Sequence, residues 1–235
     1  MTTFTIIRTE FFLYLHKIRF FLILSFVVAI TSFAGILVEV DDPLRLFMPQ
    51  ALAYYLGIFI GLSVISEDYE NKTLTALVLR AIPRRTILIG KSVSLVLIYT
   101  LITIIALVFA EVILFLFSGI HYTPVLLFRA FASSVLTAFI MISLTVLVSS
   151  YFLKMIPTAI ASFIIFLLLI LLSVGASLAP IIAYFSPFFY VTDLGTPIPM
   201  TTQEIIISII GALIYAVAFL GIAILFFENR ELVNL

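Results

Sequence analysis

The sequence has no cysteine and few charged residues, and both shortages narrow the classes of protein to which it can belong. Without cysteine there is no disulfide framework, no thiolate metal site and no catalytic thiol. Charged residues make up 10% of the 235 positions, whereas 64% are hydrophobic and the mean hydropathy is +1.36. Soluble domains carry about 25% charged residues. The composition therefore indicates an all-α polytopic membrane protein, and its zero net charge gives no sign of a nucleic-acid partner.

The residue groupings that catalysis and metal binding require are also missing. His16 and His121 have no acidic or histidine neighbour at ligand spacing, and no intramembrane His or Lys is available to activate a serine. Gly90-Lys91-Ser92 matches the end of a phosphate-binding loop, but that motif requires glycine at position 85, which is arginine. We predict no catalytic, metal or cofactor site in this chain, so any ATP must be bound by another chain.

Six apolar runs predict six membrane-spanning helices, because about 20 residues cross a hydrocarbon core of about 30 Å. We place them at residues 20–38, 48–65, 92–118, 129–149, 157–174 and 205–227. Residues 4–18 alternate apolar and polar side chains at helical spacing, which predicts an amphipathic elbow helix in the membrane interface, with a frayed tail as the alternative. The first run is long and lacks a small-residue cleavage pattern close behind it, so we expect no cleavable signal peptide.

Basic residues are distributed unevenly between the two sides that six spans define. On one side lie Arg8, Lys17, Arg19, Lys72, Arg80, Arg84, Arg85, Lys91, Lys154 and Arg230. On the other side lie only Arg45 and Arg129. Because Lys and Arg accumulate in cytoplasmic loops, the first side is predicted to be cytoplasmic. We expect a multi-pass protein of the cell membrane with both termini in the cytoplasm.

The central stretch, residues 66–91, packs eight charged residues between two long apolar runs. It opens with acids, continues with leucine and valine at helical spacing, breaks at a proline and resumes with basic residues. This pattern predicts an amphipathic cytoplasmic helix that a soluble partner recognises, with an ordinary solvated loop as the alternative. The residues that we expect to take part are Glu67, Asp68, Glu70, Thr73, Leu74, Leu77, Val78, Pro83, Arg84, Arg85 and Lys91.

Residues 175–203 are too rich in proline and aromatic residues to span a membrane. Aromatic rings favour the membrane–water interface, so we predict a re-entrant or interfacial segment on the outer side. Within it, Phe188 and Phe189 are candidates for an outer gate. Thr201-x-x-Glu204 predicts a capping box at the start of the sixth span.

Two further features lie inside the apolar runs. Gly57-x-x-x-Gly61 allows close approach of two helices, and we favour packing within the chain over a dimer seam.

Glu111 is an acidic residue in an apolar run, so one interpretation is a role in a transport pathway. It lies about 30 Å along the helix from Lys91, which places it near the outer surface if Lys91 is near the inner one. This favours the alternative interpretation, that Glu111 is an outer polar or helix-packing residue.

Four short motifs of the central stretch resemble the permease subunits of type 2 ATP-binding-cassette transporters. In that family the second span leads to a glutamate, a threonine-leucine step, a proline before basic residues and a Gly-Lys entering the third span. The counterparts here are Glu67, Lys72-Thr73-Leu74, Pro83-Arg84-Arg85 and Gly90-Lys91. Lys72 stands where the family often has glycine. The elbow, six spans, outer segment and charged tail at 228–232 extend the resemblance over nearly the whole chain.

The resemblance implies a half-transporter that forms the translocation pathway as a homodimer or heterodimer. Each permease chain would dock a cytoplasmic ATPase, which carries the ATP and Mg, through the helix in the central stretch. We expect an exporter, although the sequence contains no ligand cluster that identifies a substrate. The alternatives are a secondary transporter driven by an ion gradient and a non-transporting membrane scaffold or assembly factor.

Overall fold

The computed structural model describes residues 3–16, 23–27, 29–30, 48–71, 82–118, 122–174, 184–196 and 198–229. The main helices are α1 (Thr3–Leu15), α3 (Met48–Leu62), α4 (Ser66–Glu70), α6 (Arg84–Ser118), α7 (Pro124–Phe152), α8 (Met155–Val174), α10 (Pro187–Leu194) and α11 (Thr202–Glu228). Within these ranges all regular structure is helical, which confirms the all-α class. Thr73, Leu74, Leu77 and Val78 lie outside the described residues.

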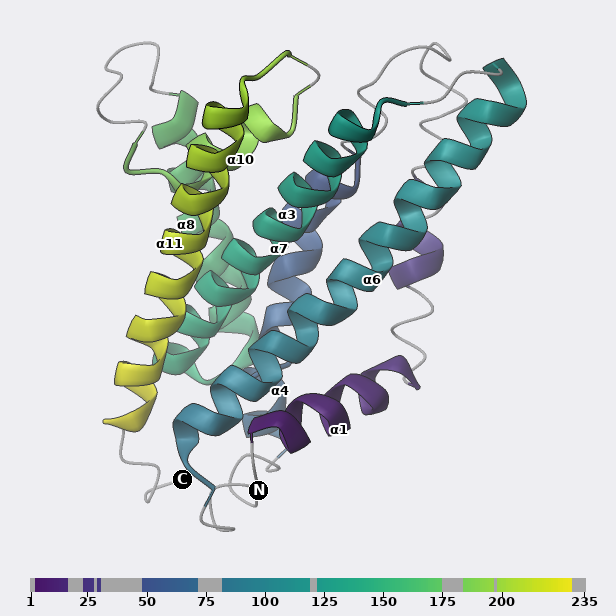
Figure 1. Ribbon diagram of the computed structural model, residues 1–235. Coiled ribbons are helices and arrows are strands. Elements are labelled where there is room, and N and C mark those ends of the chain that lie inside the picture. Colours follow the sequence, from purple (N-terminus) through teal and green to yellow (C-terminus); the bar gives the residue numbers. More distant parts are fainter. Residues whose placement is uncertain are drawn as a thin grey trace.

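Five described helices are long and apolar enough to cross a membrane. They are Pro49–Glu70, Arg84–Ile113, Pro124–Phe152, Met155–Ser173 and Thr202–Glu228. In the predicted first span, 20–38, residues 23–27 and 29–30 are helical and the rest lie outside the described ranges. The long helices run side by side, and α1 lies across one end of α6 (Figure 1). We call this the α1 end of the bundle, and the opposite end the α10 end.

Helix α7 forms the centre of the bundle. In its most apolar window 78% of the residues are buried, compared with 17% in α8 and 22% in α11. Buried hydroxyls of α7 bond to its own backbone, as Ser134 Oγ does to Ala130 O at 2.8 Å and Thr145 Oγ1 to Met141 O at 2.8 Å. Helices α8 and α11 consequently leave broad apolar faces outside this chain's own core.

The two glycines of the G-x-x-x-G motif lie where α3 packs against α7. A Cβ atom at Gly57 would lie 2.5 Å from Met141 Cβ, and one at Gly61 would lie 2.7 Å from Thr145 Cβ. Both neighbouring atoms are attached directly to the α7 backbone, so they cannot swing aside. The glycines therefore allow the two helix backbones to approach closely within one chain.

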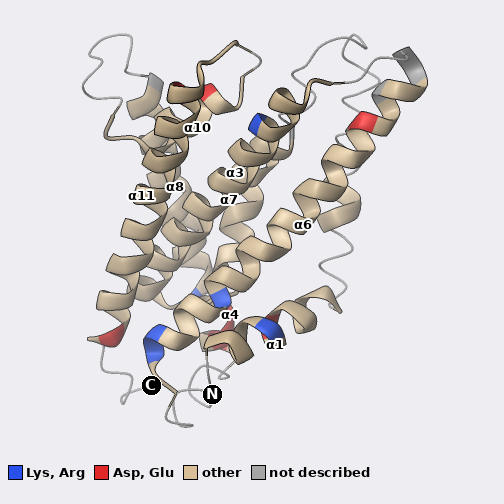
Figure 2. Cartoon of the chain, viewed as in Figure 1, with Lys and Arg blue, Asp and Glu red and all other residues tan. Residues whose placement is uncertain are grey.

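The two ends of the bundle have different elements. At the α10 end, α11 begins with the predicted capping box: Thr201 N donates to Glu204 Oε2 at 2.7 Å, and Glu204 N donates to Thr201 Oγ1 at 3.3 Å. At the α1 end, α1 begins and α11 ends (Figure 1). Charged residues of the described chain gather towards these two ends, and the middle of the bundle is almost free of them (Figure 2).

Candidate functional site

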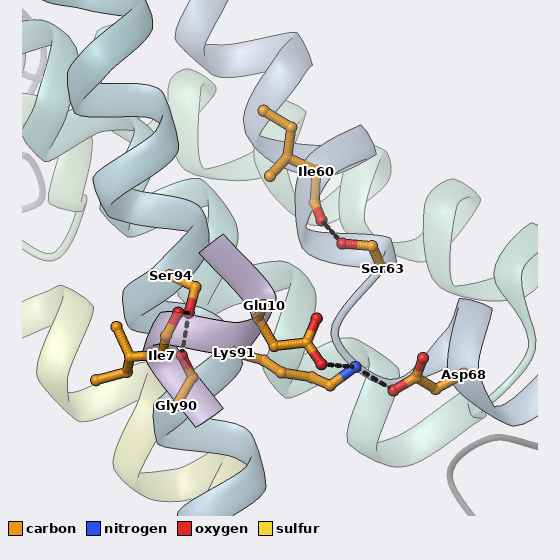
Figure 3. A network of polar contacts seen from close by, with 8 residues as sticks. All are labelled: Ile7, Glu10, Ile60, Ser63, Asp68, Gly90, Lys91 and Ser94. Atoms are coloured by element: carbon orange, nitrogen blue, oxygen red, sulfur yellow. Dashed lines mark hydrogen bonds and ion pairs between the residues drawn. The ribbon is translucent and has the colours of Figure 1, made fainter. Parts of the chain in front are cut away.

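Lys91 lies near the start of α6, where α1, α4 and α6 meet. Only 6% of the residue is exposed. Its Nζ lies 3.3 Å from Glu10 Oε1 of α1 and donates a hydrogen bond to Asp68 Oδ2 of α4 (Figure 3). The side chains of Asp68 and Glu10 are 16% and 32% exposed. One buried ammonium group therefore joins three helices that are far apart in the sequence, and we call these three residues the Lys91 triad.

The residues on either side of Lys91 position α1 on α6. A Cβ atom at Gly90 would lie 2.7 Å from Ile6 Cγ2, so only glycine allows α1 to approach this closely. Ser94, one turn further along α6, places its Oγ 3.1 Å from Ile7 O and 2.7 Å from Gly90 O (Figure 3). The Gly-Lys pair, which resembles the end of a phosphate-binding loop in the sequence, is thus part of the contact between α1 and α6.

Helix α4 is held by polar contacts on its other sides as well. Ser63 Oγ donates to Ile60 O at 2.7 Å in the turn that leads into it (Figure 3). Ser66 Oγ lies 2.5 Å from Ser149 Oγ of α7 and 3.2 Å from Thr158 Oγ1 of α8.

Glu70, at the end of α4, caps the start of α8. Its Oε1 accepts a hydrogen bond of 2.8 Å from Met155 N, one of the first backbone N–H groups of that helix, which have no partner inside the helix itself. Together with the Lys91 triad, these contacts connect the opening of the central stretch to four other helices.

The downstream flank of the central stretch is attached to α11 through Arg84. Its Nη1 donates to Phe227 O at 3.1 Å and to Glu228 O at 3.2 Å, and the guanidinium lies 6.0 Å from the centre of the Phe227 ring. A cation at the carboxyl end of a helix is favourable, because the last carbonyls there carry partial negative charge. Both described flanks of residues 72–81 are therefore attached to the bundle.

We expected the charges of the central stretch to face a partner, and at least four of those that the structure describes contact the chain itself. Asp68, Glu70, Arg84 and Lys91 join helices of this chain, whereas Arg85 is exposed. Glu67 is partly exposed and Pro83 is exposed just before α6. Thr73, Leu74, Leu77 and Val78 are outside the described residues. The sequence analysis did not identify Glu10 and Ser94, since no local spacing signals a contact between α1 and a helix about 80 residues further along the chain.

At the α10 end, buried Arg129 of α7 holds the end of α10 and the segment that follows it. It is 3% exposed. Its Nη1 donates to Ile198 O at 2.8 Å, and its Nη2 lies 2.9 Å from Asp193 O and 2.7 Å from Thr196 O. Backbone carbonyls of an irregular segment need such donors when water is excluded. Arg129 thus fixes this segment on the bundle.

Phe188 and Phe189 of α10 have different surroundings. Phe188 is 1% exposed, and its ring centre lies 5.2 Å from that of Tyr54 and 5.6 Å from that of Phe166. Phe189 lines a pocket of about 420 Å³ between α10 and α11 that opens at the surface. Phe188 is therefore a packing residue of the bundle, and Phe189 is the one of the two that faces a cavity.

Two carboxyl groups, those of Asp193 and Glu204, line the same pocket. Partial loss of hydration raises the pKa of the Asp193 carboxyl, the neighbouring Glu204 raises it further, and the Arg129 guanidinium opposes both. Asp193 consequently takes up a proton at a higher pH than a fully hydrated aspartate does. Glu204 is already engaged in the capping box of α11.

Glu111 lies near the far end of α6 and is partly buried. Its Oε2 accepts a hydrogen bond of 3.4 Å from Tyr122 N, two residues before α7 begins. The carboxylate therefore links the end of one long helix to the beginning of the next. Among the described residues, no group of three His, Asp or Glu side chains is arranged to hold a metal ion.

These features define a class: a polytopic helical membrane protein with a charged stretch attached to one end of its bundle. The family model for ABC-2 family transporter proteins matches residues 9–232. The chain belongs to this family and is the membrane-spanning permease component of an ABC transporter. A comparison with curated proteins finds no match.

Proposed function

We propose that the chain is the permease half of an ABC exporter. In this proposal two permease chains pair to form the translocation pathway, and the α1 end faces the cytoplasm with both termini. A separate ATPase, which binds ATP and Mg, docks on the central stretch of each permease. The apolar faces of α8 and α11 are available to lipid and to the second permease chain. The transporter acts in the cell membrane.

The contacts at both flanks of the central stretch carry this proposal. Upstream, Asp68 pairs with Lys91 of α6 and Glu70 binds Met155 N of α8. Downstream, Arg84 binds the last carbonyls of α11. A force applied to the intervening residues is therefore passed to α6, α8 and α11 together. Coupling between distant sites needs such a contiguous set of packed helices and polar contacts.

The apolar residues between these flanks supply the docking surface in our proposal. Leu74, Leu77 and Val78 would fill a groove on the ATPase, as one face of an amphipathic helix does. Exposed Arg85 would steer the encounter. The transported substrate and the outer gate are assigned to the α10 end, where Phe189 lines a pocket.

Leu77→Asp is expected to weaken ATPase binding at least about tenfold. Burial of one leucine side chain contributes about 1.5–3 kcal/mol, and desolvating the new carboxylate adds to the loss. The measurement is co-purification of the ATPase and ATP hydrolysis from membranes with matched permease abundance. Asn71→Asp, which adds the same charge at an exposed position nearby, is the matched control and should change little. Unchanged binding and hydrolysis in Leu77→Asp would show that this stretch is not the coupling element and would favour a scaffold.

A further inference from the structure

An apolar groove runs between α1 and the first half of α6. Its volume is about 420 Å³, and its lining includes Phe4, Arg8 and Phe12 of α1 together with Leu97 and Ile104 of α6. Phe4 is 73% exposed, Phe12 51% and Leu97 45%, so the groove opens towards the outside of the chain. Leu97 and Ile104 belong to a helix that is long and apolar enough to cross a membrane, so acyl chains are the expected neighbours of this side of the groove.

Arg8 is the charged residue of this groove. It is exposed, and among the described residues it has neither an ion pair nor a hydrogen bond from its side chain. Glu10, the nearby acid of α1, is committed to Lys91. The second polar lining residue, Thr100, is satisfied by its own helix, because its Oγ1 donates to Val96 O at 2.8 Å. The groove thus combines an apolar surface with one cation, Arg8, that has no anionic partner among the described residues.

We propose that this groove binds one anionic phospholipid of the inner leaflet, with the phosphate at Arg8 and an acyl chain along Leu97 and Ile104. The leaflet assignment rests on the proposed function, which places the α1 end at the cytoplasmic face, where anionic lipids are enriched. A zwitterionic lipid fits the apolar surface equally well but gains less from Arg8. The occupied groove lies beside the Gly90–Ile6 contact, so the lipid would hold α1 against α6.

The sequence contains no tryptophan, so one introduced indole reports its own lipid neighbours. Leu97→Trp places the reporter in the groove, and Ile164→Trp, at a 52% exposed position of α8, is the control outside it. Each purified variant is placed in bilayers that mix phosphatidylglycerol with phosphatidylcholine. In one series the phosphatidylglycerol carries bromine, and in the other the phosphatidylcholine does. Bromine quenches indole fluorescence on contact, so the quenching curves give the relative occupancy of the two lipids.

At position 97 we expect an approximately fivefold preference for phosphatidylglycerol, the ratio that one basic residue near a lipid phosphate provides. Arg8→Gln should reduce this ratio to about one, Arg8→Lys should retain most of it, and raised salt should weaken it. At position 164 the ratio should stay near one. Equal quenching by both lipids at position 97, or a preference that Arg8→Gln leaves unchanged, would overturn the proposal. The bilayers contain no ATPase, so either failure leaves the permease proposal standing.

Discussion

Lys91→Met is expected to destabilise the α1 end by about 3 kcal/mol and to uncouple the permease from its ATPase. Removing one partner of a buried ion pair costs about 3–5 kcal/mol, because an uncompensated charge is left behind. The lower value applies here, since the Glu10 side chain is 32% exposed and water screens it. The Asp68 side chain is 16% exposed, so it accounts for most of this loss of stability. Without the ammonium group, α4 loses its ionic link to α1 and α6.

The measurements are the thermal unfolding midpoint of the purified permease and the ATP hydrolysis of the assembled transporter. Lys154→Met, at an exposed lysine near the start of α8, is the matched control and should behave like the wild type. Adding Glu10→Gln and Asp68→Asn to Lys91→Met removes the unpaired charges, so the unfolding midpoint should recover while coupling stays low. A normal midpoint together with normal hydrolysis in Lys91→Met would contradict the assigned role of the triad.

Arg129→Met is expected to release the end of α10 and the segment that follows it. The guanidinium group serves three backbone carbonyls at 2.7–2.9 Å, and a hydrogen bond to a charged group contributes about 1.5–3 kcal/mol. Methionine keeps much of the volume of the side chain but donates no hydrogen bond. We expect a loss of at least about 3 kcal/mol for docking of this segment, with α7 itself intact.

A single cysteine reports this release, because the chain has none of its own. Leu194→Cys sits at a position that is fully buried, so a thiol reagent should label it slowly. Arg129→Met should accelerate labelling at least about tenfold. Asp193→Asn is the control: it removes the nearby charge but keeps the backbone carbonyl that Arg129 binds, so labelling should stay slow. The same slow labelling in Arg129→Met would contradict this account of the α10 end.

Local patterns in the sequence were sufficient to predict the long helices and the start of α11. Uninterrupted apolar runs correspond to α6, α7, α8 and α11, and Thr201-x-x-Glu204 forms the predicted capping box. These features depend on side-chain periodicity and on contacts between residues a few positions apart. Both kinds of feature can be recognised in a single sequence.

The contacts that assemble the site could not be predicted in the same way. Lys91 meets Glu10 only because Gly90 lets α1 cross α6, and that crossing is a property of the packed bundle. The acceptors of Arg129 are backbone carbonyls, which every residue type offers. Phe188 and its neighbour Phe189 look alike in sequence, and the phase of a two-turn helix decides which one is buried.

We place the surface on which the ATPase acts between Glu70 and Pro83. Leu77→Cys in the otherwise cysteine-free chain tests it with a thiol reagent that does not cross membranes, applied to sealed vesicles of both orientations. We predict labelling from the cytoplasmic face only, and loss of that labelling when the ATPase is bound. Labelling from the outer face, or cytoplasmic labelling that bound ATPase does not reduce, would contradict it.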